Sequence, residues 1–233
     1  MMQYNKGITF SFDDGHTTDR KLIEILNRYN LKATLNLNSG TMVRYCGWRY
    51  KDKDYFKLEP EEAKELYKGH EIASHGLCHA NLQNLNDANV DMEIRKDMDF
   101  LEQMFGQKIE GFVYACGRYD ERTLKKLREC GIKYARKVPV TKSYSLPCGN
   151  MLECEYSFCV DDCFDDDYFK NTVDEFLNST DDTPKILSLW GHSFAQDGNE
   201  LWEKLENFCK KISGRKDILY GTNAEVFKYF NLI

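Results

Sequence analysis

The sequence predicts one barrel-like α/β domain over residues 1–233, with about seven parallel strands wrapped by helices. Strand-like and helix-like segments alternate along the whole chain, which is typical of parallel strands that are joined by helices. The chain has only four prolines, and neither a breaker-rich linker nor an internal repeat divides it. Its hydrophobic fraction of 42 % is sufficient for the core of a single domain.

Seven segments have the composition of strands. The first, 7–12, reads G-I-T-F-S-F and is rich in the β-branched and aromatic residues that favour a pleated, half-buried surface. The other six are 33–37, 71–74, 111–115, 132–138, 185–190 and 217–220. In barrels of this kind the working residues lie where strands end. The candidate site residues are therefore expected directly after Phe12, Ser74, Ala115 and Trp190, and near Arg136.

Helices are predicted between these strands, at 18–29, in a short helix that begins at Pro60, and at 89–105, 121–129, 200–212 and 224–230. Apolar residues recur at helical spacing in the long segments. Pro60 suits a first helical turn, and Gly131 suits the end of a helix. The polar stretch 38–57 is predicted to be a long loop.

The charge and hydropathy of the chain exclude several classes of partner. A net charge of -6 leaves no basic stripe for nucleic acid or for an anionic membrane. No run approaches the ~20 apolar residues of a membrane span. The mildly acidic charge favours a neutral substrate. The N-terminal M-M-Q-Y-N-K lacks the apolar segment of a signal peptide, so we expect a cytoplasmic protein. The sequence does not assign an oligomeric state.

The nine cysteines are interpreted as free thiols. Nine is an odd number and a low density for a disulfide-stabilised fold, which favours a reducing compartment. Four of the cysteines fall between Cys148 and Cys163, with spacings that include no C-x-x-C pair. A second metal site there is therefore the weaker alternative to ordinary buried thiols.

Two strand ends carry residues that can hold a metal ion. The first strand ends at Asp13 and Asp14, adjacent acids that are costly to bury without a partner; a simple Asp-Gly turn is the alternative. His75 and His79 are four residues apart, so both rings can face one point, with a surface helix as the alternative. Three such ligands and an open water position form the usual catalytic zinc site. Asp14, His75 and His79 are predicted to supply them.

His192 comes after the last long strand and a glycine. Its ordinary pKa lies near neutrality, so it can donate a proton at working pH; a packed core histidine is the alternative. His16 and His70 are interpreted as structural. All five histidines of the chain lie in or beside a proposed strand end, and this clustering favours the metal hypothesis over chance.

These motifs together resemble those of the polysaccharide deacetylases, the NodB-like enzymes of carbohydrate esterase family four. The runs are S-F-D-D-G at 11–15, S-H-G-L-C-H at 74–79 and W-G-H-S at 190–193, and their order and spacing match from Gly7 to about Tyr229. The resemblance implies a distorted (β/α) barrel. It also implies a carbohydrate N-deacetylase, which is a hydrolase of carbon–nitrogen bonds other than peptide bonds.

The resemblance gives each matching residue a role. Asp13 is the general base, Asp14, His75 and His79 hold a divalent metal, and His192 is the general acid. The metal is zinc in the first instance, with cobalt, nickel, manganese or iron as alternatives. A bound cation lowers the pKa of its water from about 15.7 towards about 7. That water would attack the acetyl group of an acetylamino sugar or oligosaccharide.

The third motif departs from the family pattern, which is Arg-Pro-Pro-Tyr-Gly or Ala-Tyr-Pro-Tyr-Gly. Here it is V-Y-A-C-G, so Val113 replaces the arginine that orients the base. Cys116 replaces the tyrosine whose backbone N–H joins the oxyanion hole, and it keeps that N–H. Arg136, at the end of the next strand, is the candidate to reach Asp13 in place of the missing arginine; a surface arginine is the alternative.

Several further residues are candidates for supporting the predicted catalytic residues or for contacting the substrate. Asp161 or Asp162 is the candidate support for His192, and the sequence does not choose between them. Trp48 and Trp190 are candidates for stacking on a sugar ring, with core packing as the alternative.

Three functions stay open. The first is N-deacetylation of a small intracellular sugar or oligosaccharide. The second keeps the same site but cleaves an ester, or a linear or cyclic amide such as a ureide. The third is a degenerate member that binds sugar or metal without turnover, which the altered third motif suggests.

Overall fold

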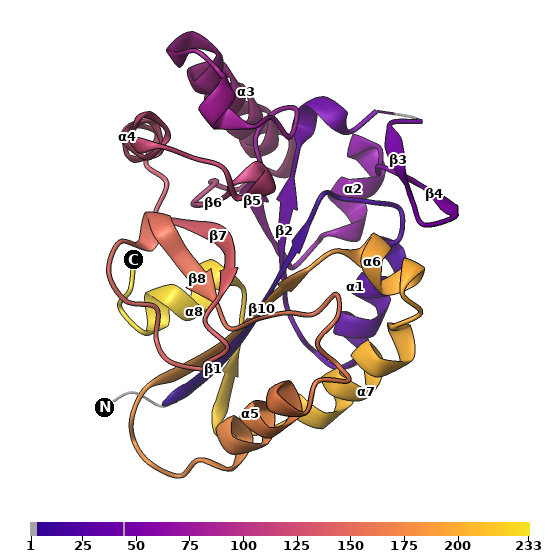
Figure 1. The fold of residues 1–233 in the computed structure, drawn as a ribbon, viewed down its shortest axis with the longest axis vertical. Coiled ribbons are helices and arrows are strands. Elements are labelled where there is room, and N and C mark those ends of the chain that lie inside the picture. The colour runs from indigo at the N-terminus through magenta and orange to yellow at the C-terminus, as the bar shows by residue number, and fades with distance from the viewer. Residues whose placement is uncertain (1–3, 44) are drawn as a thin grey trace.

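The computed structural model describes residues 4–43 and 45–233, and its central feature is a parallel β-sheet that curls into a nearly closed barrel (Figure 1). The strand order is β8-β7-β6-β5-β2-β1-β10-β9, and β11 lies against the first half of β1. Every pairing in this sheet is parallel. The strands are β1 (Lys6–Asp13), β2 (Thr34–Leu37), β5 (Glu71–Ser74), β6 (Gly111–Val113), β7 (Tyr134–Val140), β8 (Cys154–Tyr156), β9 (Phe158–Cys159), β10 (Lys185–Gly191) and β11 (Ile218–Tyr220). The predicted distorted (β/α) barrel is confirmed.

Helices pack around the outside of the strands (Figure 1). They are α1 (Asp19–Arg28), α2 (Pro60–Leu66), α3 (Asp87–Phe105), α4 (Glu121–Cys130), α5 (Asp167–Asn178), α6 (Ser193–Gly198), α7 (Trp202–Ile212) and α8 (Asn223–Tyr229). Pro60 begins α2, and Gly131 ends α4 with a φ of 82°, as the sequence predicts. In α1, Leu22 and Leu26 are fully buried against the barrel, and each such side chain contributes about 1.5–3 kcal/mol to folding.

One short segment closes the barrel. β8 pairs with β7 and β9 pairs with β10, and Ser157 lies between the two strands. The backbone N–H of Ser157 donates to the carbonyl of Ser188 at 2.8 Å. The chain therefore changes its partner within a few residues, from one edge of the sheet to the other. The sequence analysis assigned no element here, because strands of two or three residues are too short to show an alternating pattern.

The stretch predicted as a long loop, 38–57, contains an antiparallel hairpin instead. Its strands are β3 (Gly47–Tyr50) and β4 (Lys53–Phe56). Tyr50 and Tyr55 pack their rings against Phe194 of α6, with centroids 5.2 and 5.8 Å away. Aromatic contacts with a distant helix hold this hairpin, and no pattern within the stretch itself predicts them.

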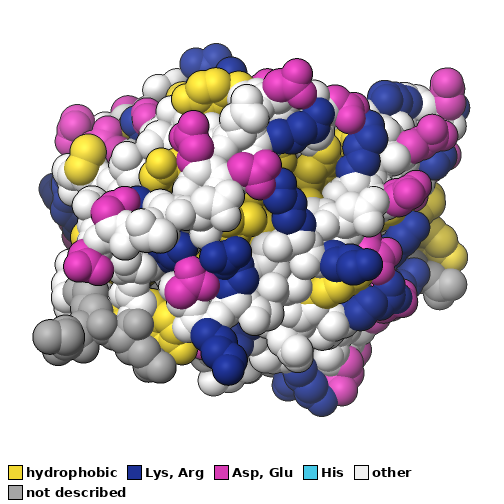
Figure 2. Space-filling model, turned by 90° about the horizontal axis from the view of Figure 1, so that it is seen from below, with side chains coloured by type: hydrophobic (Ala, Val, Ile, Leu, Met, Phe, Trp, Pro, Cys, Tyr) yellow, Lys and Arg dark blue, Asp and Glu magenta, His cyan; other side chains and the backbone are white. Residues whose placement is uncertain are grey.

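The structure also contains α5 and α6, which the sequence analysis did not predict. Within the described residues, no helix is long and apolar enough to cross a membrane. On the face drawn in Figure 2, basic and acidic side chains are interspersed, and no stripe of one sign forms among the described residues shown there.

Candidate active site

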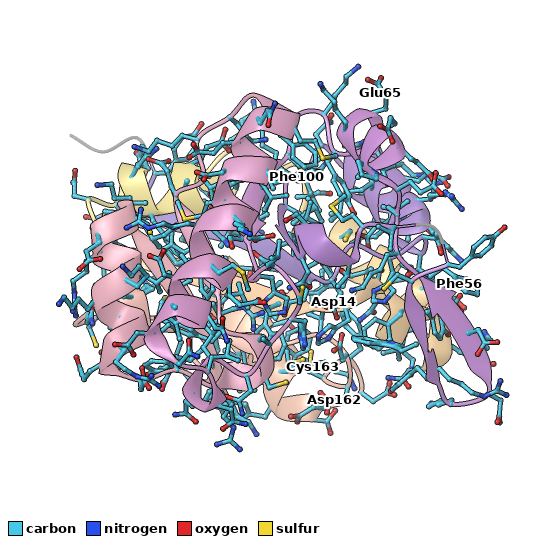
Figure 3. All side chains as sticks on the ribbon, turned by 90° about the horizontal axis from the view of Figure 1, so that it is seen from above. Asp14, Phe56, Glu65, Phe100, Asp162 and Cys163 are labelled. Atoms are coloured by element: carbon cyan, nitrogen blue, oxygen red, sulfur yellow. The ribbon has the colours of Figure 1, made fainter. Side chains whose placement is uncertain are left out.

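The residues singled out in the sequence meet at the carboxyl ends of the barrel strands, where parallel barrels place their working side chains. They come from the end of β1, the loop after β5, β7 and the residue after β10: Asp13 and Asp14, His75 and His79, Arg136, and His192. In Figure 3 Asp14 lies near the middle of the molecule, with Phe56 of the hairpin to one side and Asp162 and Cys163 below it in that view.

Asp14, His75 and His79 form a cluster with the composition of a metal site. One ligand atom from each residue lies within 4.8 Å of the others, and no other group of this kind occurs among the described residues. Asp14 and His75 are buried, whereas His79 is partly exposed. The Oδ2 atom of Asp14 is buried and has no hydrogen-bond partner among these residues. A lone buried carboxylate oxygen is costly, so an oxygen held in this way suits a cation.

His75 has the ring orientation of a ligand. Its Nδ1 lies 2.8 Å from the carbonyl oxygen of Val113, which accepts a hydrogen bond from Nδ1–H. This bond fixes the tautomer and leaves the lone pair of Nε2 free. Burial lowers the pKa of His75 to about 4, so the ring is neutral near pH 7, which is the form that binds metals.

Two acids on α3 hold the loop that carries both histidines. Glu93 accepts a hydrogen bond from the backbone N–H of Cys78 at 2.9 Å, and Asp97 accepts one from the Ser74 hydroxyl at 2.5 Å. Both acids are buried, and their spacing of four residues places them on one face of the helix. The sequence analysis missed them, although acids on the apolar face of a helix are a signal that could have identified them.

Three of the predicted site residues have a strained backbone. The φ angles are 82° for Asp14, 57° for His79 and 54° for Cys116. Residues other than glycine avoid this left-handed region, and such strain is retained mainly where the surrounding structure needs it. Cys116 lies in a short 3₁₀ turn, Ala115–Gly117, and is exposed.

Asp13 is held by two polar partners. Asn36 Nδ2 donates to its Oδ1 at 2.7 Å, and Arg136 Nη2 donates to its Oδ2. Burial alone would raise the pKa of Asp13, but the positive charge of Arg136 and that of His192 outweigh burial and hold this pKa below its usual value. Asp13 is therefore ionised at neutral pH, as a general base must be. Asn36 was not predicted; it is a buried polar residue of β2.

Arg136 lies inside the molecule, so the alternative of a surface arginine is wrong. It is 1 % exposed, and its guanidinium carbon lies 4.0 Å from the centre of the Trp190 ring. The expected contact with Asp13 is present. Trp190 is itself largely buried, so it provides a cation–π platform for Arg136.

His192 is paired with Asp161, so the structure selects Asp161 over Asp162 as its partner. Nδ1 of His192 lies 2.6 Å from Oδ2 of Asp161, and the backbone N–H of His192 donates to Oδ1. Burial works to lower the pKa of His192, but the hydrogen bond and the charge of Asp161 outweigh it and raise the pKa to about 9. Nε2 lies 3.8 Å from Asp13 and 4.0 Å from Asp14.

Lys57 and Trp48 complete one side of the site, and sequence analysis gave Lys57 no role. The buried Nζ of Lys57 donates to the carbonyl of Asp14 at 2.7 Å and to its Oδ1 at 3.2 Å. Trp48 lies over Lys57 with its ring centre 5.2 Å from Nζ, and its ring is 6.5 Å from that of His79. His16 is buried beneath Trp48, with ring centres 5.0 Å apart. Trp48 stays 37 % exposed, so it can meet a substrate.

The cysteines form no second metal centre among the described residues. All nine are free, and none belongs to a group whose ligand atoms converge. This agrees with the interpretation of the segment from Cys148 to Cys163 as ordinary thiols.

An Asp–His–His cluster, an ionised carboxylate and a histidine–carboxylate pair therefore meet at the strand ends of the barrel, where they could hold a metal ion and transfer protons. The chain belongs to the polysaccharide deacetylase family, whose model matches residues 3–135. The matched part includes Asp13, Asp14, His75 and His79 and ends one residue before Arg136.

Relatives with known names point the same way. The Bacillus subtilis (strain 168) protein YxkH, named provisionally as a polysaccharide deacetylase, is 28 % identical over 128 residues, which are 54 % of this chain. The matched region spans 42 % of that protein, less than half of its length.

Solved structures share the fold over nearly the whole chain. Puue allantoinase has a TM-score of 0.71 at 14 % identity, covering 98 % of this chain and 91 % of that one. The Xyl-CE4 domain of a xylanase from the Trinervitermes trinervoides hindgut metagenome has a TM-score of 0.63 at 16 % identity, covering 97 % and 91 %. The peptidoglycan N-acetylglucosamine deacetylase Bc1960 has a TM-score of 0.61 at 19 % identity, covering 97 % and 94 %. At these identities the likeness is one of fold.

Proposed function

We propose that the chain is a metal-dependent deacetylase that hydrolyses the N-acetyl group of an acetylamino sugar or oligosaccharide. One observation carries this proposal. Asp13, paired with Arg136, and His192, paired with Asp161, lie 3.8 Å apart beside the Asp14–His75–His79 cluster. A base, an acid and a set of metal ligands in one place are what amide hydrolysis needs.

A divalent cation would be held by Asp14, His75 and His79. The free Oδ2 of Asp14 and the free Nε2 of His75 support this assignment. Mixed carboxylate and imidazole ligands suit zinc, and also cobalt, nickel, manganese or iron. When bound, the cation acidifies a water and polarises the acetyl carbonyl.

The residues of the chain then divide the proton transfers. Asp13, kept ionised by Arg136, takes a proton from the attacking water as the water oxygen bonds to the acetyl carbon. His192, kept protonated by Asp161, gives its Nε2 proton to the amine as the carbon–nitrogen bond breaks. The products are acetate and the amino sugar. The backbone N–H of Cys116 would stabilise the oxyanion, while its thiol takes no part.

Acetate release tests the proposal. Purified protein, stripped with a chelator and reloaded with each metal in turn, is incubated with N-acetylglucosamine, chitooligosaccharides and acetylated xylan. We expect release from the N-acetylated sugars only, abolished by the chelator. In Asp13→Asn the rate should fall roughly 10²–10⁴-fold, the usual contribution of a general base. Calorimetric sugar binding without acetate release at any metal loading would overturn the proposal and support a binding protein. Release from xylan alone would make the protein an O-esterase.

A further inference from the structure

The proposed general acid depends on one carboxylate, that of Asp161, which lies in the turn that follows β9. Oδ2 of Asp161 accepts a hydrogen bond from the ring of His192, and Oδ1 accepts one from the backbone N–H of the same residue. An aspartate side chain has several rotamers, and only some of them present Oδ2 to the imidazole. The residues that fix Asp161 therefore also fix the orientation of the acid.

Two side-chain amides at helix α6 hold Asp161 in place. Nε2 of Gln196 donates to the carbonyl of Val160 at 3.0 Å and to Oδ1 of Asp161 at 3.2 Å. Nδ2 of Asn199, the residue after α6, donates to the backbone carbonyl of Asp161 at 3.0 Å. The carboxylate and the main chain of Asp161 are thus both tied to the helix that begins directly after His192.

Gln196 is fully buried, and this position is costly for an amide. Its backbone N–H donates to the carbonyl of His192 at 3.2 Å, so the helical turn fixes its place relative to the acid. Oε1 of its side chain has no hydrogen-bond partner among the described residues. An apolar side chain would avoid the cost of this orphan acceptor. What Gln196 provides is therefore its pair of donor contacts, with Val160 and Asp161.

The last residue of β10 leaves room for the Asp161 carboxylate. A Cβ atom at Gly191 would lie 2.6 Å from Oδ1 of Asp161 and 2.8 Å from Cγ2 of Val160. Both distances are well below ordinary van der Waals contact. The absence of a side chain at Gly191 thus lets the carboxylate lie against the backbone of β10, where it meets the N–H of His192.

The β3–β4 hairpin supports the same helix. The Tyr50 hydroxyl donates to Oδ1 of Asn199 at 3.2 Å, and the Phe194 ring packs against both Tyr50 and His192, with ring centres 5.2 and 5.0 Å away. Helix α6 also contacts α1 and α7 on the outside of the barrel (Figure 1). It is therefore a firmly packed support for the two amides.

We infer that Gln196, assisted by Asn199, is a positioning residue for the proposed acid, because it holds the Asp161 carboxylate with Oδ2 towards Nδ1 of His192. This inference rests on the proposed function. Gln196 has no surface for a substrate, so it acts through Asp161. If Gln196 served only to bond the Val160 carbonyl at the end of β9, its loss would lower stability without a change at His192.

Acetate-release kinetics of zinc-loaded Gln196→Met test the inference, since methionine keeps the length of the side chain and removes both donors. We expect kcat to fall roughly tenfold, as for one lost hydrogen bond to a charged group, while KM stays within about twofold. In Asp161→Asn protein the same substitution should change kcat by less than about twofold, because the carboxylate that Gln196 positions is gone. The matched control is Asn223→Leu, which removes a fully buried amide at the amino end of the barrel. It should lower stability and leave kcat unchanged.

A second readout needs no turnover. The Nδ1 proton of His192 lies in a 2.6 Å hydrogen bond to a carboxylate, so its NMR resonance should appear downfield of the backbone amides and be missing in Asp161→Asn. In Gln196→Met this resonance should move upfield or broaden, and in Asn223→Leu it should stay in place. If Gln196→Met does not fold, Asn199→Ala, at a partly exposed position, should shift the same resonance.

Three results would overturn the inference. They are an unmoved His192 resonance in the folded variant, an unchanged kcat in Gln196→Met, and a loss of kcat that is just as large in the Asp161→Asn background. Absent acetate release from every sugar would overturn the proposed function instead, and the resonance would still test the role of Gln196.

Discussion

The two ends of the barrel both bury carboxylates, and they stabilise them in opposite ways. At the amino ends of the strands, Glu71 accepts hydrogen bonds from the hydroxyls of Thr34 and Tyr134 and from the backbone N–H of Ala224. All three donors are neutral, and burial raises the pKa of Glu71. At the carboxyl ends, Asp13 and Asp14 are paired with cations, Arg136 and Lys57. Their pKa values are lowered although burial opposes this.

The two ends of the barrel also differ in how completely their carboxylates are hydrogen-bonded. Both carboxylate oxygens of Glu71 have partners, so the group ties β2, β5, β7 and α8 together and has no oxygen left for a ligand. Asp14 keeps one buried oxygen without a partner. A carboxylate that is kept ionised and incompletely bonded is a poor stabiliser but a good ligand or base. The contrast therefore separates a structural acid from the acids of the proposed catalytic centre.

The largest expected effect is the loss of stability when Arg136, the cationic partner of Asp13, is removed. Arg136→Met leaves Asp13 buried without its charge partner, and this should lower the free energy of unfolding by about 3–5 kcal/mol. Glu71→Gln keeps an oxygen for the donors of Glu71 and should cost less than about 1 kcal/mol. Urea unfolding at pH 7 measures both variants.

A double variant makes this test specific. Arg136→Met combined with Asp13→Asn removes both charges of the pair, so it should recover much of the stability that Arg136→Met loses. Equal destabilisation by Glu71→Gln and Arg136→Met would contradict the comparison. It would mean that neutral donors and a cationic partner stabilise the buried carboxylates equally.

The fold was largely predictable from the sequence because strands and helices alternate in it. The residues at two strand ends could also be named in advance. Asp13 and Asp14 come at the end of one apolar strand, and His75 and His79 follow another directly and four residues further on. Arg136 was predicted to replace the arginine that the third motif lacks, and its contact with Asp13 is present in the structure.

What the sequence could not provide depends on contacts between distant segments. Lys57 lies in a stretch that looks like a polar loop, and it reaches Asp14 because its backbone pairs with that of His16, far away in the sequence. The choice between Asp161 and Asp162 depends on which side chain the turn after β9 directs at His192. Neither fact leaves a periodic trace in the sequence.

An intermediate effect is expected on the pH dependence of catalysis. The general acid must be protonated, and the pKa of His192 is raised to about 9, so activity should hold up to about pH 9 and fall above it. Asp161→Asn removes the charge that favours the protonated ring, so the alkaline limb of kcat should move to lower pH by roughly one to two units.

Asp162→Asn is the matched control for this shift, because Asp162 is adjacent in sequence and exposed whereas Asp161 makes the hydrogen bond to His192. Its pH profile of kcat should coincide with that of the unmodified protein. An alkaline limb that stays in place in Asp161→Asn would mean that His192 does not limit activity at high pH.

The smallest expected effect is a change in zinc affinity on removal of Lys57. Lys57 is the cationic partner of Asp14, and Glu71 has no such partner. Nζ of Lys57 lies 3.2 Å from Oδ1 of Asp14, so a divalent cation on this carboxylate is repelled by a neighbouring positive charge. Lys57→Met should therefore bind zinc about tenfold more tightly, as calorimetry on the chelator-treated protein would show. Lys53→Met is the matched control: it lies on the same hairpin, pairs with Asp197 and should leave zinc affinity unchanged. Weaker zinc binding in Lys57→Met would mean that Lys57 acts chiefly by orienting Asp14. The Lys57 ammonium would then prepare the metal site instead of repelling the metal.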